Sequence, residues 1–277
     1  MPADLHIHSN FSDGIDTPEE IVGLAKKAGL NTIALTDHDV VDGIERAQKA
    51  GEIAGIIEVI PGIEFTCEMP NAEVHILGYF IDYKNSKLKT VLKTIQDDRV
   101  KRIGRICEKL NGLGINLKPE EVLAISGSGV PGRPHVARAL IKKGIVSNFK
   151  EAFIRFLDNK APAFVGHYRL TPVEAIKLII EIGGIAVFAH PAVSNCDDLI
   201  PDFIKDGLRG IEVYYGGHNY LQTKKYLALA KKYGLLVTGG SDFHGTNSGR
   251  EVKLGDTYLK DEYLKELKDE HLRRNKS

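Results

Sequence analysis

Short apolar segments rich in β-branched residues alternate with amphipathic helical segments along most of the chain, and this alternation constrains the fold most. Seven such segments predict strands, at residues 4–8, 32–36, 57–65, 73–80, 185–189, 210–215 and 235–238. After the first of them, Thr17-Pro18-Glu19-Glu20 is typical of a helix start, and Gly29 of a helix end. Continuously apolar strands separated by helices favour a parallel sheet covered on its outer face. We therefore expect an α/β fold in which seven strands form a parallel β/α barrel.

Residues 86–160 interrupt this alternation. Apolar residues recur there at helical spacing, and strand-like segments are almost absent; the spaced residues include Leu88, Leu92, Ile95, Ile103, Ile106 and Leu110. We expect residues 1–85 and 161–277 to form the barrel domain and residues 86–160 to form an all-helical insertion domain.

Charge and composition exclude several classes of protein. Lys plus Arg and Asp plus Glu both number 37, so no net positive charge attracts long duplex nucleic acid. No apolar run reaches the roughly 18 residues of a membrane span, and residues 1–6 lack the pattern of a signal peptide. The three scattered cysteines, Cys67, Cys107 and Cys196, fit a reduced compartment, so we expect a cytoplasmic protein. The sequence carries no clear mark of its oligomeric state.

Histidines and carboxylates gather near the ends of the predicted strands. The histidines are His6, His8, His38, His75, His190 and His244, and the acidic residues are Asp13, Asp37, Glu64 and Asp242. In a closed parallel barrel the C-terminal ends of all strands open onto one face, so these side chains are expected around one cavity. His75 lies nearer the start of its strand and fits this pattern least well.

Each of these motifs alone has a structural explanation, as a strand pair, a turn or a helix cap, but their conjunction favours a metal site. Imidazole and carboxylate ligands without thiolate suit manganese, iron or zinc. Six imidazoles exceed the needs of one ion, so we expect two or three divalent metal ions. Such ions hold phosphoryl oxygens and generate a hydroxide nucleophile near neutral pH.

Five segments resemble the motifs of the PHP (polymerase and histidinol phosphatase) family and occur in the family's order: residues 4–14 (DLHIHSNFSDG), 36–39 (TDHD), 61–64 (PGIE), 189–191 (AHP) and 241–244 (SDFH). The resemblance implies a distorted seven-stranded barrel with a trinuclear metal centre. It implies one metal on His6, His8, Glu64 and Asp242, a second on Glu64, His75 and His190, and a third on Asp13, His38 and His244. Some family members carry His in place of Asp13, which leaves the identity of the third metal open.

Asp37, His190 and Asp242 are the residues that we expect to take part in catalysis. For Asp37 the sequence leaves a second interpretation open, in which its carboxylate orients a ligand without touching the metal.

The segment Gly132-Arg133-Pro134-His135 stands out in the predicted insertion. Pro134 fits a first helical turn, so Arg133 at the helix start would form an anion site suited to phosphate. A solvated surface arginine is equally consistent with the sequence. The chain also resembles the nucleoside 3′,5′-bisphosphate phosphatases of the family, some of which trim RNA from the 5′ end. That resemblance implies that Arg133 and His135 hold a substrate phosphate.

Two further histidines are predicted to contact substrate. His167 follows the predicted insertion and is expected to act like His135. Tyr214, Tyr215 and His218 follow the sixth predicted strand, where they would line the mouth of the site and stack a base, or pack beneath a loop.

The function we expect is a metal-dependent phosphohydrolase that releases phosphate from a small phosphorylated nucleotide, namely a nucleoside 3′,5′-bisphosphate. The first alternative is a 5′-to-3′ exoribonuclease or oligonucleotide phosphodiesterase acting on short 5′-phosphorylated RNA. The second is histidinol phosphatase, which the helical insertion disfavours. The third is a non-enzymatic metal-binding scaffold, which is disfavoured because all nine predicted ligand positions carry competent side chains.

Overall fold

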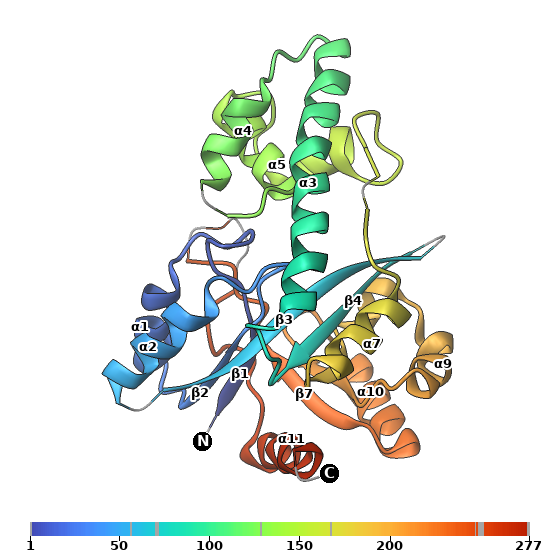
Figure 1. Ribbon diagram of the computed structural model, residues 1–277. Coiled ribbons are helices and arrows are strands. Elements are labelled where there is room, and N and C mark those ends of the chain that lie inside the picture. Colours follow the sequence, from blue (N-terminus) through green and yellow to red (C-terminus); the bar gives the residue numbers. More distant parts are fainter. Residues whose placement is uncertain are drawn as a thin grey trace.

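Seven strands form one sheet in chain order in the computed structural model, which describes residues 2–55, 57–69, 72–127, 129–166, 168–246, 248 and 252–275. The strands are β1 (Ala3–Ile7), β2 (Thr32–Leu35), β3 (Glu58–Met69), β4 (Ala72–Tyr79), β5 (Ile185–Phe188), β6 (Gly210–Tyr215) and β7 (Leu236–Gly240). A bridge between Ile7 and Phe243 brings the chain after β7 back to β1, so the sheet forms a nearly closed barrel (Figure 1). The predicted seven-stranded α/β barrel is confirmed.

The barrel is not entirely parallel, because β4 runs antiparallel to both of its neighbours. Thr66 of β3 pairs with His75 of β4, and Ile76 of β4 pairs with Phe188 of β5, whereas the other strand pairs are parallel. The prediction of an all-parallel sheet was therefore wrong for β4. Only two residues separate β3 from β4, and a parallel connection needs a dozen or more.

Helices cover the outside of the barrel and begin as the sequence predicts. In α1 (Pro18–Lys27) the N–H of Glu20 donates to Thr17 Oγ1 (3.3 Å), and the N–H of Thr17 donates to Glu20 Oε2 (2.8 Å). This reciprocal cap satisfies two backbone donors that the helix leaves unpaired. The other covering helices are α2 (Ile44–Ala54), α7 (Pro172–Glu181), α8 (Pro191–Ser194), α9 (Ile200–Lys205), preceded by the short 3₁₀ helix η2 (Asp197–Leu199), α10 (Tyr220–Tyr233) and α11 (Asp261–Arg274).

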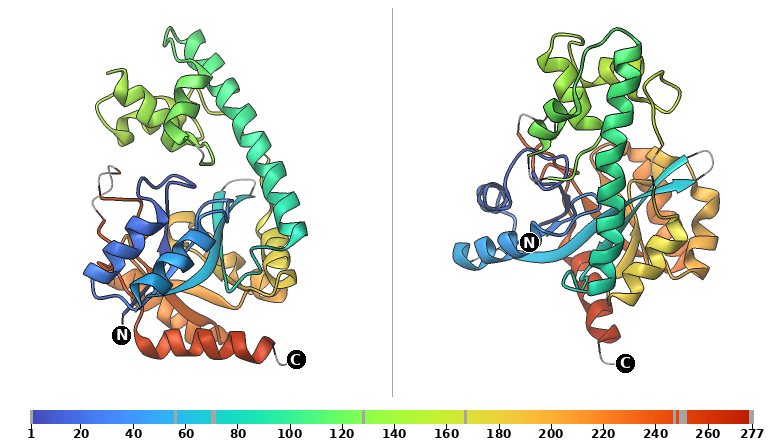
Figure 2. Two further views of the ribbon diagram at one scale, coloured as in Figure 1. Left: turned by 60° about the vertical axis from the view of Figure 1, so that its left-hand side comes forward. Right: turned by 45° about the horizontal axis from the view of Figure 1, so that its top comes forward.

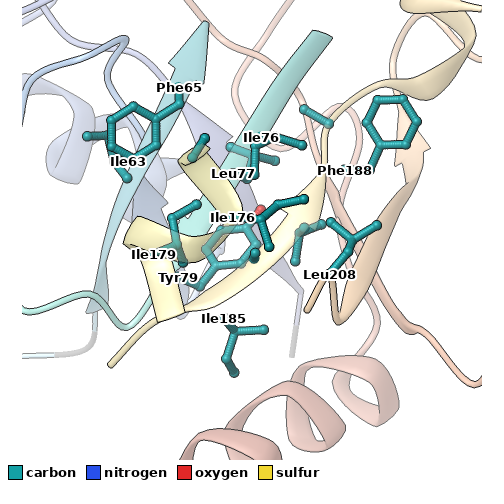
Figure 3. Packing of buried hydrophobic residues seen from close by; sticks show 14 of the residues in the cluster. Ile63, Phe65, Ile76, Leu77, Tyr79, Ile176, Ile179, Ile185, Phe188 and Leu208 are labelled. Atoms are coloured by element: carbon teal, nitrogen blue, oxygen red, sulfur yellow. The ribbon is translucent and has the colours of Figure 1, made fainter. Parts of the chain in front are cut away.

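The main core lies between the sheet and helix α7. Tyr79, Leu77 and Phe65 of the strands are fully buried and belong to one apolar cluster with Ile176 and Ile179 of α7 (Figure 3). The hydroxyl of Tyr79 donates to the carbonyl of Leu5 at 3.0 Å, which satisfies the one polar atom of this side chain in the interior.

Helices occupy most of the chain between β4 and α7 and rise from one end of the barrel (Figures 1 and 2). They are α3 (Ser86–Gly112), α4 (Pro119–Ser126), α5 (Arg133–Lys142), α6 (Phe149–Ala152) and the π-helix η1 (Phe153–Leu157). The first half of α3 packs on the barrel core through Leu88 and Leu92. Its second half packs into a separate apolar group, here called the insertion cluster, which includes Ile103, Ile106, Leu110, Val136, Leu140 and Leu157. The domain limits 1–85, 86–160 and 161–277 stay a prediction.

Two further observations bear on the expected setting of the protein. Cys67, Cys107 and Cys196 form no disulfide. Among the helices of the described ranges, none combines the length and the apolar character needed to cross a bilayer.

Candidate metal centre

The nine predicted metal ligands meet at one end of the barrel. They come from β1 and its following loop, from the ends of β2, β5 and β7, from the middle of β3 and from β4. Because β4 is antiparallel, its first half lies at the same barrel end as the C-terminal ends of the parallel strands. The antiparallel direction therefore explains how His75, near the start of its strand, reaches the site.

Glu64 of β3 lies at the middle of this group and is 1% exposed. Its carboxylate oxygens approach five imidazoles: Oε2 lies 3.2 Å from His6 Nε2, His8 Nε2 and His38 Nδ1, and Oε1 lies 2.8 Å from His75 Nδ1 and 3.0 Å from His190 Nε2. A single carboxylate among so many potential ligands has the position expected of a group shared between metal ions.

Two aspartates extend the cluster on the side of β1 and β7. Asp242 Oδ1 lies 3.1 Å from His8 Nε2 and 3.5 Å from His6 Nε2. Asp13 Oδ1 lies 3.2 Å from His244 Nε2. Ligand atoms close enough to share an ion form four groups: His8–Asp13–His38–His244, His6–Glu64–His190, His6–His8–Asp242 and His38–Glu64–His75.

These groups agree in part with the division that the family resemblance implies. Asp13, His38 and His244 occur together, as expected of the third metal. His6, His8 and Asp242 also occur together, as expected of the first. Glu64 is grouped with His190 and with His75 separately. The number of ions and the ligands of each stay predictions.

Several ligand atoms of the cluster are buried without a hydrogen-bond partner in the described part of the chain. They include His6 Nε2, His8 Nε2 and Glu64 Oε2. Buried polar atoms are normally hydrogen-bonded, so a set of unpaired imidazole nitrogens and a carboxylate oxygen facing one another fits bound cations. This donor set, without thiolate, suits manganese, iron or zinc.

The charges in the cluster hold its central carboxyl group ionised. Burial alone raises the pKa of Glu64, but the charges of neighbouring histidines, His6 and His75 among them, outweigh burial and hold this pKa well below its usual range. Burial lowers the pKa of His38 well below its usual value, which favours its neutral imidazole. Burial also acts to lower the pKa of His75, but the neighbouring Glu64 and Glu73 raise it to about 10, so a metal bound by His75 would displace its proton. Ionised carboxylate and neutral imidazole are the forms that bind metals.

Two of the predicted ligands occupy unusual backbone conformations. His190 has φ 25° and Asp242 has φ 56°, in the region that favours glycine. Such conformations cost about 1–3 kcal/mol each and cluster at functional sites. Each residue lies two positions after the end of a strand, where the chain turns its side chains into the barrel mouth.

Glu212 of β6 completes the site and was missed by the sequence analysis. Its Oε1 accepts a hydrogen bond from His6 Nδ1 (2.9 Å), and its Oε2 accepts one from the backbone N–H of His190 (2.7 Å). The first bond places the proton on Nδ1 and leaves Nε2 free to bind a metal. The signal that could have revealed it is a single carboxylate inside the apolar segment GIEVYY.

Asp37, predicted as catalytic, lies beside the ligand groups and not within them. Its carboxylate accepts hydrogen bonds from the N–H of Ser9 (2.7 Å), from Ser9 Oγ (2.6 Å) and from Ser12 Oγ. These bonds fix the loop that carries Asp13. The geometry thus supports the alternative in which Asp37 orients a ligand.

A cavity of about 210 Å³ adjoins the predicted metal ligands Asp13, His38 and His75. Four arginines line it: Arg99 and Arg102 from α3, Arg133 from the start of α5, and Arg169 from the segment before α7. Glu73 pairs with Arg133 (3.2 Å) and Arg169 (2.5 Å), and Asp39 pairs with Arg99. The predicted phosphate residue Arg133 thus belongs to a larger cationic cavity, and Arg99, Arg102 and Arg169 were missed.

The other predicted substrate residues lie elsewhere. His135 is buried, and its Nδ1 accepts the N–H of Gly132 at 3.0 Å, so its ring caps helix α5. His218 lies half-buried, with Nδ1 3.0 Å from the carbonyl of Val213, and neither histidine lines the arginine cavity. His167 lies outside the described residues. Contacts of these three histidines with substrate stay predictions.

Comparisons with known proteins agree with this geometry. A model of the PHP domain matches residues 4–157. The chain is 36% identical to a 5′-3′ exoribonuclease from Haemophilus influenzae over 87% of this chain and 89% of that protein. It is 32% identical to a 3′,5′-nucleoside bisphosphate phosphatase from Chromobacterium violaceum, over 89% and 88%. A solved structure from Bifidobacterium adolescentis, assigned as a metal-dependent phosphoesterase, superimposes with a TM-score of 0.89 at 31% identity, covering 98% of this chain and 96% of that one.

Proposed function

This chain belongs to the PHP-domain family of metal-dependent phosphoesterases, and from that premise we propose that it releases phosphate from nucleoside 3′,5′-bisphosphates. The observation that carries the proposal is the arginine cavity beside the metal ligands. A phosphatase for simple monophosphates needs one phosphate site, whereas we assign to this chain a metal centre and a second anion site next to it.

Arg102 gives the strongest support for a second anion site. Its side chain is 2% exposed, and its Nη2 has no hydrogen-bond partner among the residues described. Burial, and then the neighbouring charges of Arg133 and Arg169, lower the pKa of Arg102 to about 8. A buried cation that other cations repel is costly unless an anion compensates it. A phosphate dianion in this cavity would supply that compensation through charge-assisted hydrogen bonds.

The position of the cavity restricts the substrate. Asp13, His38 and His75 line the cavity and also belong to the ligand groups, so the two sites share a wall. Two phosphates on the same ribose can therefore occupy them together, one at the metal ligands and one among the arginines. Adenosine monophosphates and histidinol phosphate carry only one phosphate and would leave the arginine cavity uncompensated.

Bound divalent ions would polarise the phosphoryl oxygens and lower the pKa of an attacking water. The residues of this chain would hold and orient the reacting groups. Glu212 fixes His6 and the backbone of His190, and Tyr215 donates its hydroxyl to Asp242 Oδ2 at 3.4 Å. We assign Asp242 and His190 to the reacting phosphate, and we assign Asp37 to positioning the loop of Asp13.

A second candidate is 5′-to-3′ exoribonuclease activity. An open groove of about 830 Å³ borders His75, Arg133 and His190, and offers space for a nucleotide chain that continues beyond the metal centre. The terminal 5′-phosphate of an RNA would then occupy the arginine cavity. Both candidates share the requirement for two phosphates on one nucleotide, and relatives of similar identity carry each name.

The test compares adenosine 3′,5′-bisphosphate with adenosine 3′-monophosphate as substrates of Arg133→Ala and of a matched control, Arg105→Ala. Arg105 lies on α3, is about half exposed and pairs with Asp98 outside the cavity. We expect the wild type and the control to prefer the bisphosphate, and Arg133→Ala to lose this preference while it keeps its metal content. Equal use of both substrates by the wild type would contradict the proposal.

A further inference from the structure

We propose that a second, aromatic cavity beside the metal centre binds the nucleobase of the substrate by stacking it on Phe149 and Phe153. This inference rests on the proposed function, because it assumes that the substrate is a nucleotide. The cavity has a volume of about 240 Å³ and extends from Asp13 and His244 to Phe149, Phe153 and Pro134. We call it the aromatic cavity.

The local structure brings the two phenyl rings to one face. Helix α6 begins at Phe149 and continues directly into the π-helix η1, which begins at Phe153. Residues four apart on continuous helical chain lie on the same side, so both rings face the same way. Both are half-buried: they pack against the insertion cluster and also line the cavity. A π-helix is rare and occurs frequently at functional sites.

The aromatic cavity and the arginine cavity are neighbours. Phe153, Pro134 and Asp13 line both of them, and Asp13 also belongs to a candidate metal group with His244. The metal ligands, the arginines and the phenyl rings therefore surround one small region. A nucleoside bisphosphate has the matching form, since two phosphates and one base project from the same ribose.

The chemistry of the cavity suits a heteroaromatic ring. Its apolar part comes from Phe149, Phe153 and Pro134, and its edge carries the cations Arg138 and Lys150. The guanidinium of Arg138 lies 5.8 Å from the centre of the Phe149 ring. Arg138 also donates to the carbonyl of Asp13 at 2.7 Å, which ties the base site to the loop of a metal ligand. Stacking on aromatic rings accepts every base, so we expect little selectivity among bases.

Tyr215, the stacking candidate at the end of β6, is less available. Its ring lies against His190 (5.3 Å between ring centres) and against His218 (5.1 Å), and its hydroxyl donates to Asp242. The open groove, by contrast, has the exposed aliphatic side chains of Ile154 and Val193, and its only described aromatic rings are the imidazoles of the predicted metal ligands His75 and His190. Phe149 and Phe153 also have cations over their rings, Arg138 at 5.8 Å and Arg133 at 5.6 Å, but both rings line a cavity, so we place the base there.

The experiment measures the binding of adenosine 5′-monophosphate and of ribose 5-phosphate, which lacks the base, to the full chain with manganese by calorimetry. Stacking on one or two rings predicts roughly 5- to 150-fold tighter binding of the nucleotide by the wild type. Phe149→Leu keeps an apolar side chain of similar packing and should lose most of this difference, while its affinity for ribose 5-phosphate stays within about twofold. Phe149→Tyr should restore the difference, and Ile154→Ala, a control from the open groove, should leave it intact.

The inference is overturned if the wild type binds both ligands equally, or if Phe149→Leu weakens both to the same extent. Loss of the difference in Ile154→Ala but not in Phe149→Leu would also overturn it and would place the base in the open groove. Phosphate release from adenosine 3′,5′-bisphosphate is measured on the same preparations. If the protein releases phosphate but binds the nucleotide no tighter than ribose 5-phosphate, only the base site is refuted. If it binds the nucleotide tighter but releases no phosphate, only the proposed function is refuted.

Discussion

Replacing Glu212 by Gln should weaken metal binding without unfolding the protein. The two carboxylate oxygens accept hydrogen bonds from two donors, His6 Nδ1 (2.9 Å) and the N–H of His190 (2.7 Å), and Glu212 is fully buried. A glutamine amide has one accepting oxygen and one donating nitrogen. In either orientation Glu212→Gln therefore leaves one of the two buried donors facing another donor.

The expected magnitude follows from that lost bond. A buried donor without a partner costs about 1–3 kcal/mol. The loss of a group that orients a metal ligand typically lowers metal affinity about 10- to 100-fold. Titration calorimetry with manganese on metal-depleted protein measures the affinity, and thermal unfolding measures the stability. Glu270→Gln is the matched control, because Glu270 is also buried (6% exposed) but pairs with Arg209 and Arg274, away from the metal ligands.

The control should lose stability and keep the manganese affinity of the wild type. Glu212→Gln should lose manganese affinity by at least tenfold. If Glu212→Gln binds manganese with unchanged affinity and stoichiometry, Glu212 does not position His6 and His190 for metal binding.

Three further predictions test other parts of the structure. Arg102→Met should weaken binding of adenosine 3′,5′-bisphosphate about 10- to 150-fold in kinetic assays, because a charged hydrogen bond is lost. The melting temperature should stay unchanged or rise, because an uncompensated buried charge is removed. A large drop in stability at unchanged affinity would contradict this prediction. Burial lowers the pKa of His135 from 6.5 to about 4, so the folded state binds this proton less tightly than the unfolded state. The free energy of unfolding should therefore fall by about 3 kcal/mol as the pH drops from 6.5 towards 4. Urea unfolding at pH 7.5 and 4.5 should show a smaller loss of stability for His135→Gln than for the wild type. An identical loss in the two proteins would refute the prediction. Gly240→Ala should destabilise the protein by about 1–3 kcal/mol, since its Cβ would lie 2.4 Å from the backbone nitrogen of His6. Gly23→Ala, on an exposed and open part of α1, should stabilise the protein by about 0.5–1 kcal/mol. Equal melting temperatures for the two variants would refute this prediction.

Much of the fold could be predicted from the sequence, because helix caps and buried strands depend on residues that are close together in the chain. The cap of α1 by Thr17 and Glu20 needs only neighbouring residues, and the apolar strands need only their own composition. The direction of β4 depends on the length of one connection, and the strand sequence itself carries no mark of direction. The position of His75 could be explained only once that direction was known.

Part of the candidate site could likewise be predicted from the sequence, and part could not. Most of the nine predicted ligands lie in short motifs at or just after strand ends, and barrel topology is enough to bring those together. Glu64, in the middle of β3, and His75, near the start of β4, are the exceptions. The arginine cavity combines side chains from α3, α5 and the segment before α7, for which no sequence spacing rule exists. Glu212 looks like any polar residue in a strand until its two hydrogen-bond partners are known.

The proposed substrate carries two phosphates on one nucleotide. The most direct measurement is phosphate release, with added manganese, from adenosine 3′,5′-bisphosphate in parallel with AMP, histidinol phosphate and a 5′-phosphorylated RNA oligomer. We expect kcat/KM to be highest for the bisphosphate, and the single phosphates of AMP and histidinol phosphate to be released poorly. Preference for the RNA would identify the chain as a nuclease acting on 5′ ends, and release from histidinol phosphate at a rate equal to that from the bisphosphate would contradict the claim.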